Sequence, residues 1–529
     1  MGPIAQFLTT QPKGREMTTA PALRVLLVKP SKYDAGGYVQ RYRRGFMPNS
    51  TLRHIQALTP EMLHDRPVSV TMVDEHVATD LDYLDALGPE ACDLLALVGV
   101  QSNQWHRALD LAALAKTRGL RNVVIGGPHA MTCQTEIEEG SGISIAIAEA
   151  ESIWLRILED AFHGELAPVY GEEGRWQQEL DATILTPPSA EEMSHFIIPM
   201  LGIYPARGCP YLCNFCSVTQ IAGRKVRRQP HEATLETLRR AKAAGVKMVM
   251  FTSDNFNKIP GVKDLLNQMI EDDLSLPFFV QCDAMIADDE ELMELLGRAR
   301  CYTIFIGVES MNRAVLKAAH KNQNDPKKYH TMIRLCHENG ILPHFSNIIG
   351  FPEDHEEDIR SHVRELTRLN PESASFYILC PIPGTEQYAD FRKAGVIFDS
   401  PNLDRFDATC ETWKHPNFAT GTLQKFLNWC YQEANTIPRL LGRTIAPGWK
   451  WSITSRLQYL GATFYGRWVA AHGVHPMSGG VGQKRLDHVS SYLSLRREKY
   501  GFTHRPLPDN RALALVDQPT FEGIRIATA

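Results

Sequence analysis

Two series of short apolar runs, separated by stretches of helical periodicity, fill the first three quarters of the chain. The first run, "LRVLLVKP" (23–30), is aliphatic and β-branched and ends at a proline, which indicates a strand buried on both faces. Stretches such as "QWHRALDLAALAKTRG" (104–119) have the period of an amphipathic helix. Strands and helices that alternate in this way predict α/β domains with parallel sheets, which bind ligands at the carboxyl ends of their strands.

The first series predicts a doubly wound, Rossmann-like domain over residues 23–165. Its further strand runs are "VSVTMVDE" (68–75), "CDLLALVGV" (92–100), "RNVVIGGP" (121–128) and "GISIAIAEAE" (142–151). Residues 1–22 have no periodicity and are predicted to form a flexible tail. Residues 166–195 are polar and contain prolines, so we predict a linker there.

The second series predicts a partial (βα)6 TIM-like barrel over residues 196–395. Its strand runs are "IIPMLGIYPA" (197–206), "KMVMFTS" (247–253), "PFFVQCD" (277–283), "CYTIFIGVES" (301–310), "LPHFSNIIGFP" (342–352) and "ASFYILCPIPG" (374–384). Six βα units are too few for a closed eight-stranded barrel, but chemistry should still occur at the carboxyl ends of the strands. Residues 396–529 lose this alternation and are predicted to form a mainly helical C-terminal region.

Composition limits the classes of partner. The 529 residues, 43% of them hydrophobic and 22% charged, are enough for two or three folded domains. A formal net charge of -5 gives no electrostatic case for nucleic-acid binding. Neither a signal-peptide pattern nor a window of 18 apolar residues is found, so we expect a cytoplasmic protein. The aromatic and basic stretch 436–472 fits a helical lid on the barrel or a peripheral membrane contact, and both interpretations stay open.

Three of the eleven cysteines are clustered, in "RGCPYLCNFCSVTQ" (207–220) directly after the first strand of the second series. Cys209, Cys213 and Cys216 could bind three irons of a 4Fe–4S cluster and leave the fourth iron open to a substrate or cofactor. A zinc site that lacks a fourth ligand and a chance cluster of structural cysteines are the alternatives.

This cysteine motif, placed after the first strand of a six-unit βα barrel, resembles that of the radical S-adenosylmethionine (radical SAM) enzymes, and the resemblance extends over residues 204–388. It implies that the open iron binds S-adenosylmethionine, which an electron from the cluster cleaves to a 5'-deoxyadenosyl radical. It also implies cofactor contacts at the ends of later strands. These are Ser253, Asp254 and Asn255 after the second strand, Glu309 and Ser310 after the fourth, and Gly350 after the fifth. The alternative is that such residues only cap the helices that follow.

A doubly wound domain directly before such a barrel resembles the cobalamin-binding module of one large subfamily. The matching loops are "LVGVQSNQ" (97–104) and "VIGGPHAM" (124–131), which implies that Gln101, Ser102, Gly126, Gly127 and Pro128 contact cobalamin. In the alternative, Gly-Gly-Pro is only a turn. The Asp-x-His-x-x-Gly pattern that supplies an axial histidine in many cobalamin proteins is absent, and His76 is expected at the surface.

The resemblance implies a class B methylase, similar to the hopanoid methylases, that methylates an unactivated carbon of a lipid-like or polycyclic natural product. Oxidation or cyclisation, as in the anaerobic Mg-protoporphyrin cyclase, is the alternative reaction, and a non-catalytic iron–sulfur and cobalamin carrier is the alternative class. The implied cofactors are a 4Fe–4S cluster, S-adenosylmethionine and cobalamin. The implied partners are a small-molecule or lipid substrate and an electron donor such as flavodoxin or ferredoxin.

Overall fold

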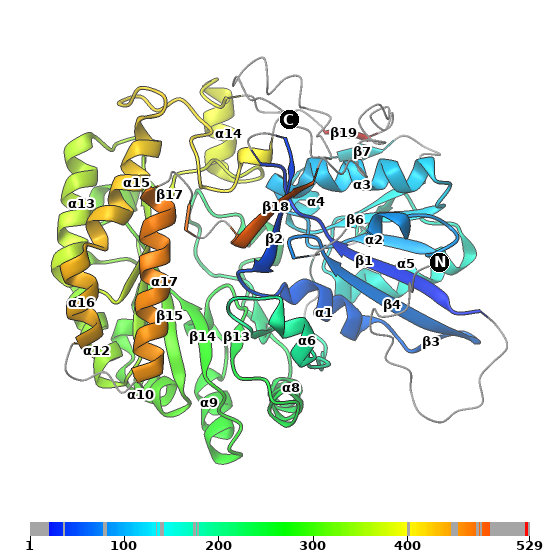
Figure 1. Cartoon of the computed structure of the whole chain (residues 1–529), viewed down its shortest axis with the longest axis horizontal. Helices are drawn as coiled ribbons and strands as arrows, with labels where there is room; N and C mark the ends of the chain where they lie inside the picture. Colours follow the sequence, from blue (N-terminus) through cyan, green and yellow to red (C-terminus); the bar gives the residue numbers. More distant parts are fainter. Residues whose placement is uncertain are drawn as a thin grey trace.

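The chain contains two parallel sheets that lie side by side, with further helices beside the second sheet (Figure 1). The computed structural model describes residues 21–34, 37–77, 82–133, 135–137, 142–172, 176, 179–398, 403–445, 453–471, 475–476, 479–486 and 524–526. The predicted tail therefore lies almost wholly outside the described residues, as does much of the segment after residue 445. The predicted α/β class with parallel sheets is confirmed.

The N-terminal sheet has seven strands, all parallel to their neighbours except at one edge, where β3 runs antiparallel to β4. Their order across the sheet is β3 (Met62–Leu63), β4 (Arg66–Asp74), β1 (Leu23–Lys29), β5 (Leu94–Leu97), β6 (Asn122–Gly126), β8 (Ile143–Ala146) and β9 (Val169–Tyr170). From β1 the chain first adds β3 and β4 on one side of the sheet and then returns to add β5, β6, β8 and β9 on the other side. The direction of winding therefore reverses between β1 and β5. Ligands of doubly wound sheets bind at such a switch point.

Strand β1 shows why this sheet is covered on both faces. Val25 and Leu27 belong to a core with helices α1 (Ser50–Leu58) and α5 (Ala150–His163). Leu26 and Val28 point to the opposite face, where α2 (Asp82–Asp85) and α3 (Trp105–Thr117) complete a second core. An unbroken apolar run is the pattern expected of a strand with a core on each side.

The second sheet has six parallel strands in chain order, with β10 and β17 at its edges. The strands are β10 (Leu201–Ile203), β13 (Val249–Phe251), β14 (Phe278–Cys282), β15 (Cys301–Glu309), β16 (Leu342–Ile349) and β17 (Ser373–Ile378). The helices between and after them are α8 (His231–Ala243), α9 (Val262–Glu271), α10 (Glu290–Arg298), α11 (Arg313–Ala318), α12 (Tyr329–Glu338), α13 (Glu356–Leu369) and α14 (Glu386–Lys393). Short 3-10 turns are η1 (Ser102–Gln104), η2 (Phe256–Lys258), η3 (Ala284–Asp288), η4 (Pro326–Lys328) and η5 (Leu403–Arg405).

Side chains of this sheet alternate between a helix-covered core and the opposite face. In β14, Phe278, Val280 and Cys282 are buried in the core that the helices share, while Phe279 and Gln281 are only half-buried. The half-buried face continues across the sheet, because Phe279 packs near Phe305 of β15. The sequence run "PFFVQCD" has the period-2 pattern that this arrangement requires.

The C-terminal helices pack at the β17 edge of the second sheet (Figure 1). Helix α15 (Thr422–Ala434) packs on β17, and α17 (Ile453–Ala471) packs on α15 and on α16 (Ile437–Ile445). Several large apolar side chains on α16 and α17 stay exposed, namely Ile437, Leu441, Phe464, Tyr465 and Trp468. Trp449 and Trp451 of the predicted aromatic stretch lie outside the described residues. None of the described helices has the length and apolarity needed to cross a bilayer.

Short antiparallel pairs tie distant parts of the chain together. Strand β18 (Gly480–Leu486) pairs with β2 (Val39–Gly45), and β19 (Ile524–Ile526) pairs with β7 (Thr135–Ile137). Helix α6 (Ala190–Ser194) lies in the predicted linker, and the side chain of Ser189, the residue before it, caps the helix. The C-terminal segment therefore returns to the N-terminal half.

Candidate functional site

The three clustered cysteines lie on one loop at the carboxyl end of β10, which we call the thiol loop (208–226). Its two ends are joined by a short antiparallel ribbon of β11 (Ala206–Arg207) and β12 (Arg227–Arg228). All three thiols are half-buried, and helix α7 (Val218–Ala222) begins just after the last of them. The predicted cysteine ligands are therefore brought to the strand edge where a βα sheet binds its ligands.

Gly208 is required by the local geometry of the thiol loop. Its φ is +101°, and a Cβ on it would lie 2.2 Å from the carbonyl oxygen of Lys225. Its N–H donates to Asp254 Oδ2 at 2.7 Å. Asp254, which the sequence predicts as a cofactor contact, thus also holds the backbone of the thiol loop through one carboxylate oxygen.

Two side-chain amides lie near the thiols as hydrogen-bond donors, and Lys321 places a positive charge beside Cys213. Asn255 Nδ2 lies 3.9 Å from Cys209 Sγ, and Gln323 Nε2 lies 3.7 Å from Cys213 Sγ. Burial raises the pKa of all three thiols and raises that of Cys216 to about 12, so metal binding has to displace their protons. Amide donors like those of Asn255 and Gln323 commonly tune the reduction potential of an iron–sulfur cluster when they donate to its cysteine sulfurs.

Across the described part of the chain, no group of three His, Cys, Asp or Glu side chains converges as the site of a single metal ion would require. A cubane cluster places each thiolate on a different iron, and so does not need such convergence.

Ser253 and Asn255 follow β13 and have different surroundings. Asn255 exchanges two hydrogen bonds with Asp283: its Nδ2 donates to Asp283 Oδ2 at 2.8 Å, and its Oδ1 accepts from Asp283 N at 3.2 Å. Ser253 is buried, and its Oγ has no hydrogen-bond partner among the described residues. A buried hydroxyl without a partner is a group that a polar ligand can satisfy.

Glu309 ends β15 in a left-handed conformation, with a φ of +62°. Its Oε1 lies 2.5 Å from Lys321 Nζ, and both side chains are largely buried. Gly307 leaves room for this pair, because a Cβ there would lie 2.5 Å from Glu309 Oε1. Burial lowers the pKa of Lys321, but Glu309 and then Cys213 raise it above its usual value. Lys321 is thus a cation beside the thiols that no sequence motif indicated.

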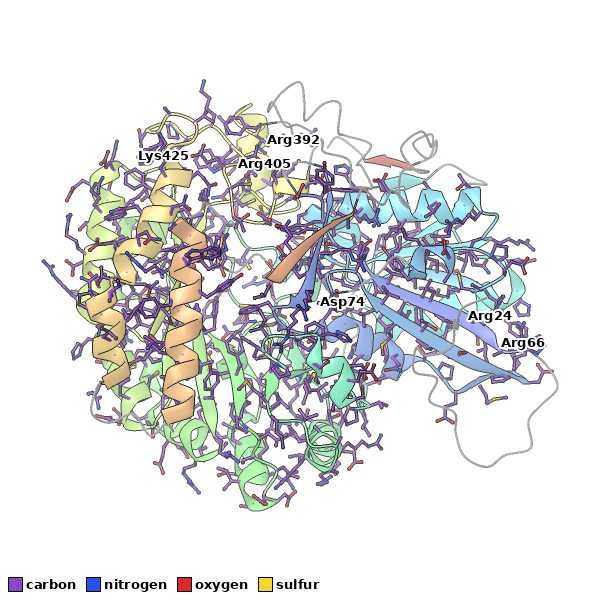
Figure 2. All side chains as sticks on the ribbon, viewed as in Figure 1. Arg24, Arg66, Asp74, Arg392, Arg405 and Lys425 are labelled. Atoms are coloured by element: carbon purple, nitrogen blue, oxygen red, sulfur yellow. The ribbon has the colours of Figure 1, made fainter. Side chains whose placement is uncertain are left out.

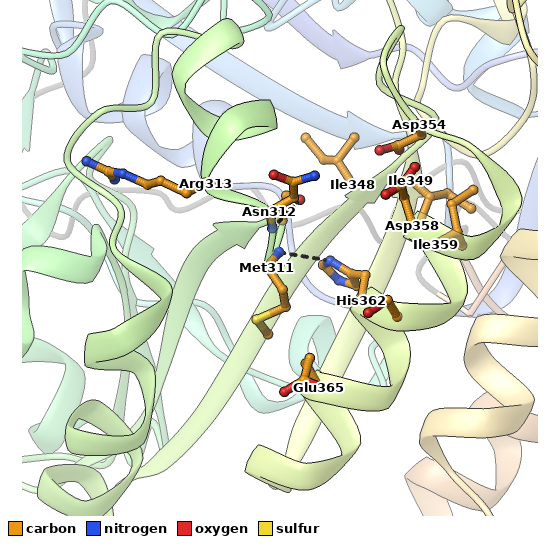
Figure 3. Close-up of a pocket in the computed structure, with 12 residues that line it drawn as sticks. Met311, Asn312, Arg313, Ile348, Ile349, Asp354, Asp358, Ile359, His362 and Glu365 are labelled. Carbon is orange, nitrogen blue, oxygen red and sulfur yellow. Dashed lines mark hydrogen bonds between the residues drawn. The ribbon is translucent and has the colours of Figure 1, made fainter.

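Ser310 lines a pocket of about 320 Å³ between the ends of β15 and β16 and the start of α13 (Figure 3). In that pocket Met311 N donates to His362 Nδ1 at 3.1 Å. Ser310 Oγ accepts from Asn312 N at 3.0 Å, as a residue that shapes a turn does. Gly350, with a φ of +79°, packs against α15, where a Cβ would lie 2.7 Å from Leu423 Cδ1.

The two loops predicted to bind cobalamin contact each other. Gln101 and Ser102 follow β5, and Gly126, Gly127 and Pro128 join β6 to α4 (Pro128–Thr132). Val100 N donates to Gly126 O at 3.0 Å, and a Cβ on Gly127 would lie 2.1 Å from Val100 N. The contact between the loops alone therefore requires glycine at position 127, where φ is +137°.

Three buried polar atoms beside these loops have no hydrogen-bond partner in the described structure: His129 Nε2, Asn103 Oδ1 and Trp105 Nε1. His129 Nδ1 lies 3.1 Å from Ser102 Oγ, and its ring centre lies 4.5 Å from that of Trp105. Burial lowers the pKa of His129 to about 3, so its imidazole is neutral. Buried groups of this kind are commonly satisfied by a ligand or by ordered water. His129 stands in the "GGPHAM" loop, although sequence reasoning did not single it out.

His76 was expected at the surface but is half-buried beside Asp74, with 3.8 Å between its Nδ1 and Asp74 Oδ1.

The two loops predicted to bind cobalamin and the thiol loop meet at one interface. Helix α4 packs against α7, which directly follows the last cysteine. At the same interface, a Cβ on Gly384 would lie 2.4 Å from Thr132 Cβ of α4. The two halves also approach closely at β10, where a Cβ on Gly202 would lie 1.7 Å from Ser50 Oγ of α1. The two predicted cofactor regions are thus in direct contact, although they are far apart in the sequence.

Residues 203–366, which include all three clustered cysteines, match the model of the Radical SAM superfamily. The chain therefore contains a radical SAM domain. The radical SAM resemblance and the enzyme class predicted from the sequence are confirmed.

Relatives of this radical SAM enzyme include several methyltransferases. The bacteriochlorophyllide d C-8(2)-methyltransferase of Chlorobaculum tepidum is 24% identical over 408 residues, which cover 74% of this chain and 86% of that protein. The C-12(1)-methyltransferase of the same organism is 27% identical over 55% of this chain, and the match spans 64% of the relative's length. The hopanoid C-2 methylase of Rhodopseudomonas palustris is 28% identical, with 68% of this chain and 67% of that protein covered.

Two solved structures share the fold. The radical S-adenosylmethionine methyltransferase TsrM from Kitasatospora setae, solved with cobalamin and a [4Fe-4S] cluster bound, has a TM-score of 0.54 at 17% identity and covers 70% of this chain and 75% of its own. The cobalamin-dependent S-adenosylmethionine radical enzyme OxsB, solved with aqua-cobalamin and S-adenosylmethionine bound, also has a TM-score of 0.54, at 14% identity, and covers 84% of this chain and 72% of its own.

Proposed function

We propose that this radical SAM enzyme methylates an unactivated carbon of a lipid-like or polycyclic small molecule, with a 4Fe–4S cluster, S-adenosylmethionine and cobalamin as its cofactors. The observation that carries the proposal is the thiol loop, which holds three cysteines at the carboxyl edge of a parallel sheet and packs through α7 against α4. The named activities of the relatives, on bacteriochlorophyllide d and hopanoids, support methylation and this class of substrate.

Cys209, Cys213 and Cys216 would hold the cluster. Asn255 and Gln323 direct amide N–H groups towards two of the sulfurs, and Lys321 supplies a positive charge beside them. When bound, the cluster supplies the electron that cleaves S-adenosylmethionine, and the corrin supplies the methyl group that the substrate receives. The half-buried position of the thiols limits the access of water to the site.

The residues that follow β13 and β15 fit a polar cofactor bound at the carboxyl ends of the strands of the second sheet. We propose that Ser253 binds S-adenosylmethionine through its unpartnered Oγ, while Asp254 and Asn255 position the thiol loop and the Asp283 turn. Glu309 orients Lys321, and Ser310 shapes the loop that follows β15. Gly350 acts through packing under α15.

The N-terminal sheet fits a large polar cofactor at the ends of β5 and β6. We propose that residues 23–165 form the cobalamin-binding domain, that 166–195 link it to a barrel at 196–395, and that 396–529 cover the barrel. The unpartnered polar atoms of His129, Asn103 and Trp105 beside Ser102 support a ligand there. An electron donor of the flavodoxin or ferredoxin type would supply the reducing electron.

The decisive experiment follows the methyl group. The full chain, purified and reconstituted anaerobically with iron, sulfide and hydroxocobalamin, is incubated with methyl-labelled S-adenosylmethionine, a reductant and the total lipid extract of its host. We expect labelled lipid together with deoxyadenosine. Deoxyadenosine without labelled product would indicate oxidation or cyclisation instead, and the absence of both would indicate a carrier.

A matched pair of cysteine variants controls for loss of thiols in general. Cys213→Ala should lose the cluster absorbance and all deoxyadenosine formation. Cys410→Ala removes another half-buried cysteine outside the thiol loop and should retain both. Equal behaviour of the two variants would refute the cluster assignment.

A further inference from the structure

Two arginines stand directly opposite each other on the ribbon that closes the thiol loop. Arg207 of β11 pairs with Arg227 of β12. Their side chains are only 18% and 4% exposed, so water can screen little of the repulsion between them. Like charges at directly opposed positions destabilise an antiparallel pair. The ribbon therefore needs negative charge from elsewhere.

That charge comes from the N-terminal half, at the end of β8. Arg227 donates from both terminal nitrogens to the two carboxylate oxygens of Glu149, each at 2.7 Å. Arg207 lies within 2.6 and 2.8 Å of the two oxygens of Glu151 and 3.5 Å from Glu149 Oε1. His54 of α1 completes the network, with its Nε2 2.6 Å from Glu151 Oε1. Both carboxylates are almost fully buried.

The ion-pair network of these arginines and glutamates holds the thiol loop at both ends. Arg207 immediately precedes Gly208 and Cys209, and Arg227 Nη2 also donates to Ala222 O, the last residue of α7, at 2.7 Å. Strand β8 ends at the same edge of the N-terminal sheet as β5 and β6, which carry the predicted cobalamin loops. One turn of the N-terminal domain therefore holds both ends of the segment that contains the cysteines.

We propose that Glu149 and Glu151, with Arg207 and Arg227, form a clamp that fixes the position of the iron–sulfur cluster relative to the corrin. The proposal rests on the proposed function. Two-point guanidinium–carboxylate pairs fix orientation as well as distance, which apolar packing does not. Such buried pairs add little net stability compared with apolar residues, so a positioning role accounts for them better than a stabilising one. None of the four is proposed to touch a cofactor; they are positioning residues.

Magnetic coupling between the two paramagnetic centres reports their relative position. The full chain, reconstituted with iron, sulfide and hydroxocobalamin and then partly reduced, should show spin–spin coupling between cob(II)alamin and the reduced cluster in its electron paramagnetic resonance spectrum. Glu149→Gln keeps the shape of the side chain but removes its charge. We expect this variant to retain iron and corrin and to lose the coupling, while Glu149→Asp retains part of it.

Asp93→Asn is the matched control. Asp93, directly before β5, accepts a two-point pair from Arg24 of β1, at 2.8 and 3.2 Å, and Arg24 lies at the end of the N-terminal sheet away from the second sheet (Figure 2). It should show wild-type coupling. Unchanged coupling in both Glu149 variants would overturn the clamp and leave the proposed function intact. A wild-type chain that takes up the cluster but no corrin would overturn the proposed function and the clamp with it.

Discussion

Replacing Gly208 by alanine tests whether the thiol loop depends on the geometry at its first residue. Alanine at a φ of +101° carries backbone strain of about 1–3 kcal/mol. Its Cβ would also lie 2.2 Å from Lys225 O. That oxygen belongs to the backbone just before β12, so relieving the clash requires a shift of the backbone next to the ribbon. If the native conformation of the thiol loop loses about 2 kcal/mol of stability, the ratio of native to non-native loop falls by a factor of roughly 30.

Gly245→Ala separates the strain from the clash. Gly245 has a φ of +77°, but a Cβ there meets no atom within 4 Å. After anaerobic reconstitution, we expect Gly208→Ala to contain little iron and to lack most of the visible absorbance of the iron–sulfur cluster. Gly245→Ala should bind iron like the wild type, with only a small loss of thermal stability. Equal iron content in the two variants would refute the assigned role of Gly208.

Two further predictions concern buried charges. Burial raises the pKa of Asp354 to about 7, although N–H groups of Phe351 and Gly350 lower it. As the pH rises, the Asp354 carboxyl therefore loses its proton at a lower pH in the unfolded chain than in the folded chain. The free energy of unfolding should thus fall by up to about 4 kcal/mol between pH 4 and 7. Urea unfolding should show a smaller fall for Asp354→Asn, and identical pH profiles would contradict this. Lys321→Met should cost about 3–5 kcal/mol of unfolding free energy, because it leaves Glu309 buried without its partner. Adding Glu309→Gln should recover part of that loss, and no recovery would argue against the pair.

Both sheets could be predicted because their strands are buried in ways that leave a pattern in the sequence. The run 23–30 is apolar throughout, since its side chains fill a core on each face. The run 277–283 alternates, since one of its faces is only half-buried. The position of the thiol loop followed from the same logic, because residues after a parallel strand lie at its carboxyl edge.

The partners of the site residues could not be predicted, because they come from elements far apart in the sequence. Asp254 stands after a strand, as a cofactor ligand does, yet it accepts the N–H of Gly208 from a loop 46 residues away. Lys321 reaches Glu309 from the turn after α11, and no motif marks it. Arg207 and Arg227 look like ordinary surface charges until the fold places them against two glutamates of the other half.

We propose that one chain holds both a 4Fe–4S cluster and cobalamin at a single interface. The decisive measurement is metal analysis of the anaerobically reconstituted full chain, with Cys213→Ala and a chain that lacks residues 1–165 measured beside it. We expect ~4 iron atoms and ~1 cobalt atom per wild-type chain. Cys213→Ala should lose the iron and keep the cobalt, and the truncated chain should lose the cobalt and keep some iron. Cobalt retained by the truncated chain, or iron retained by Cys213→Ala, would refute the assignment of the two cofactor sites.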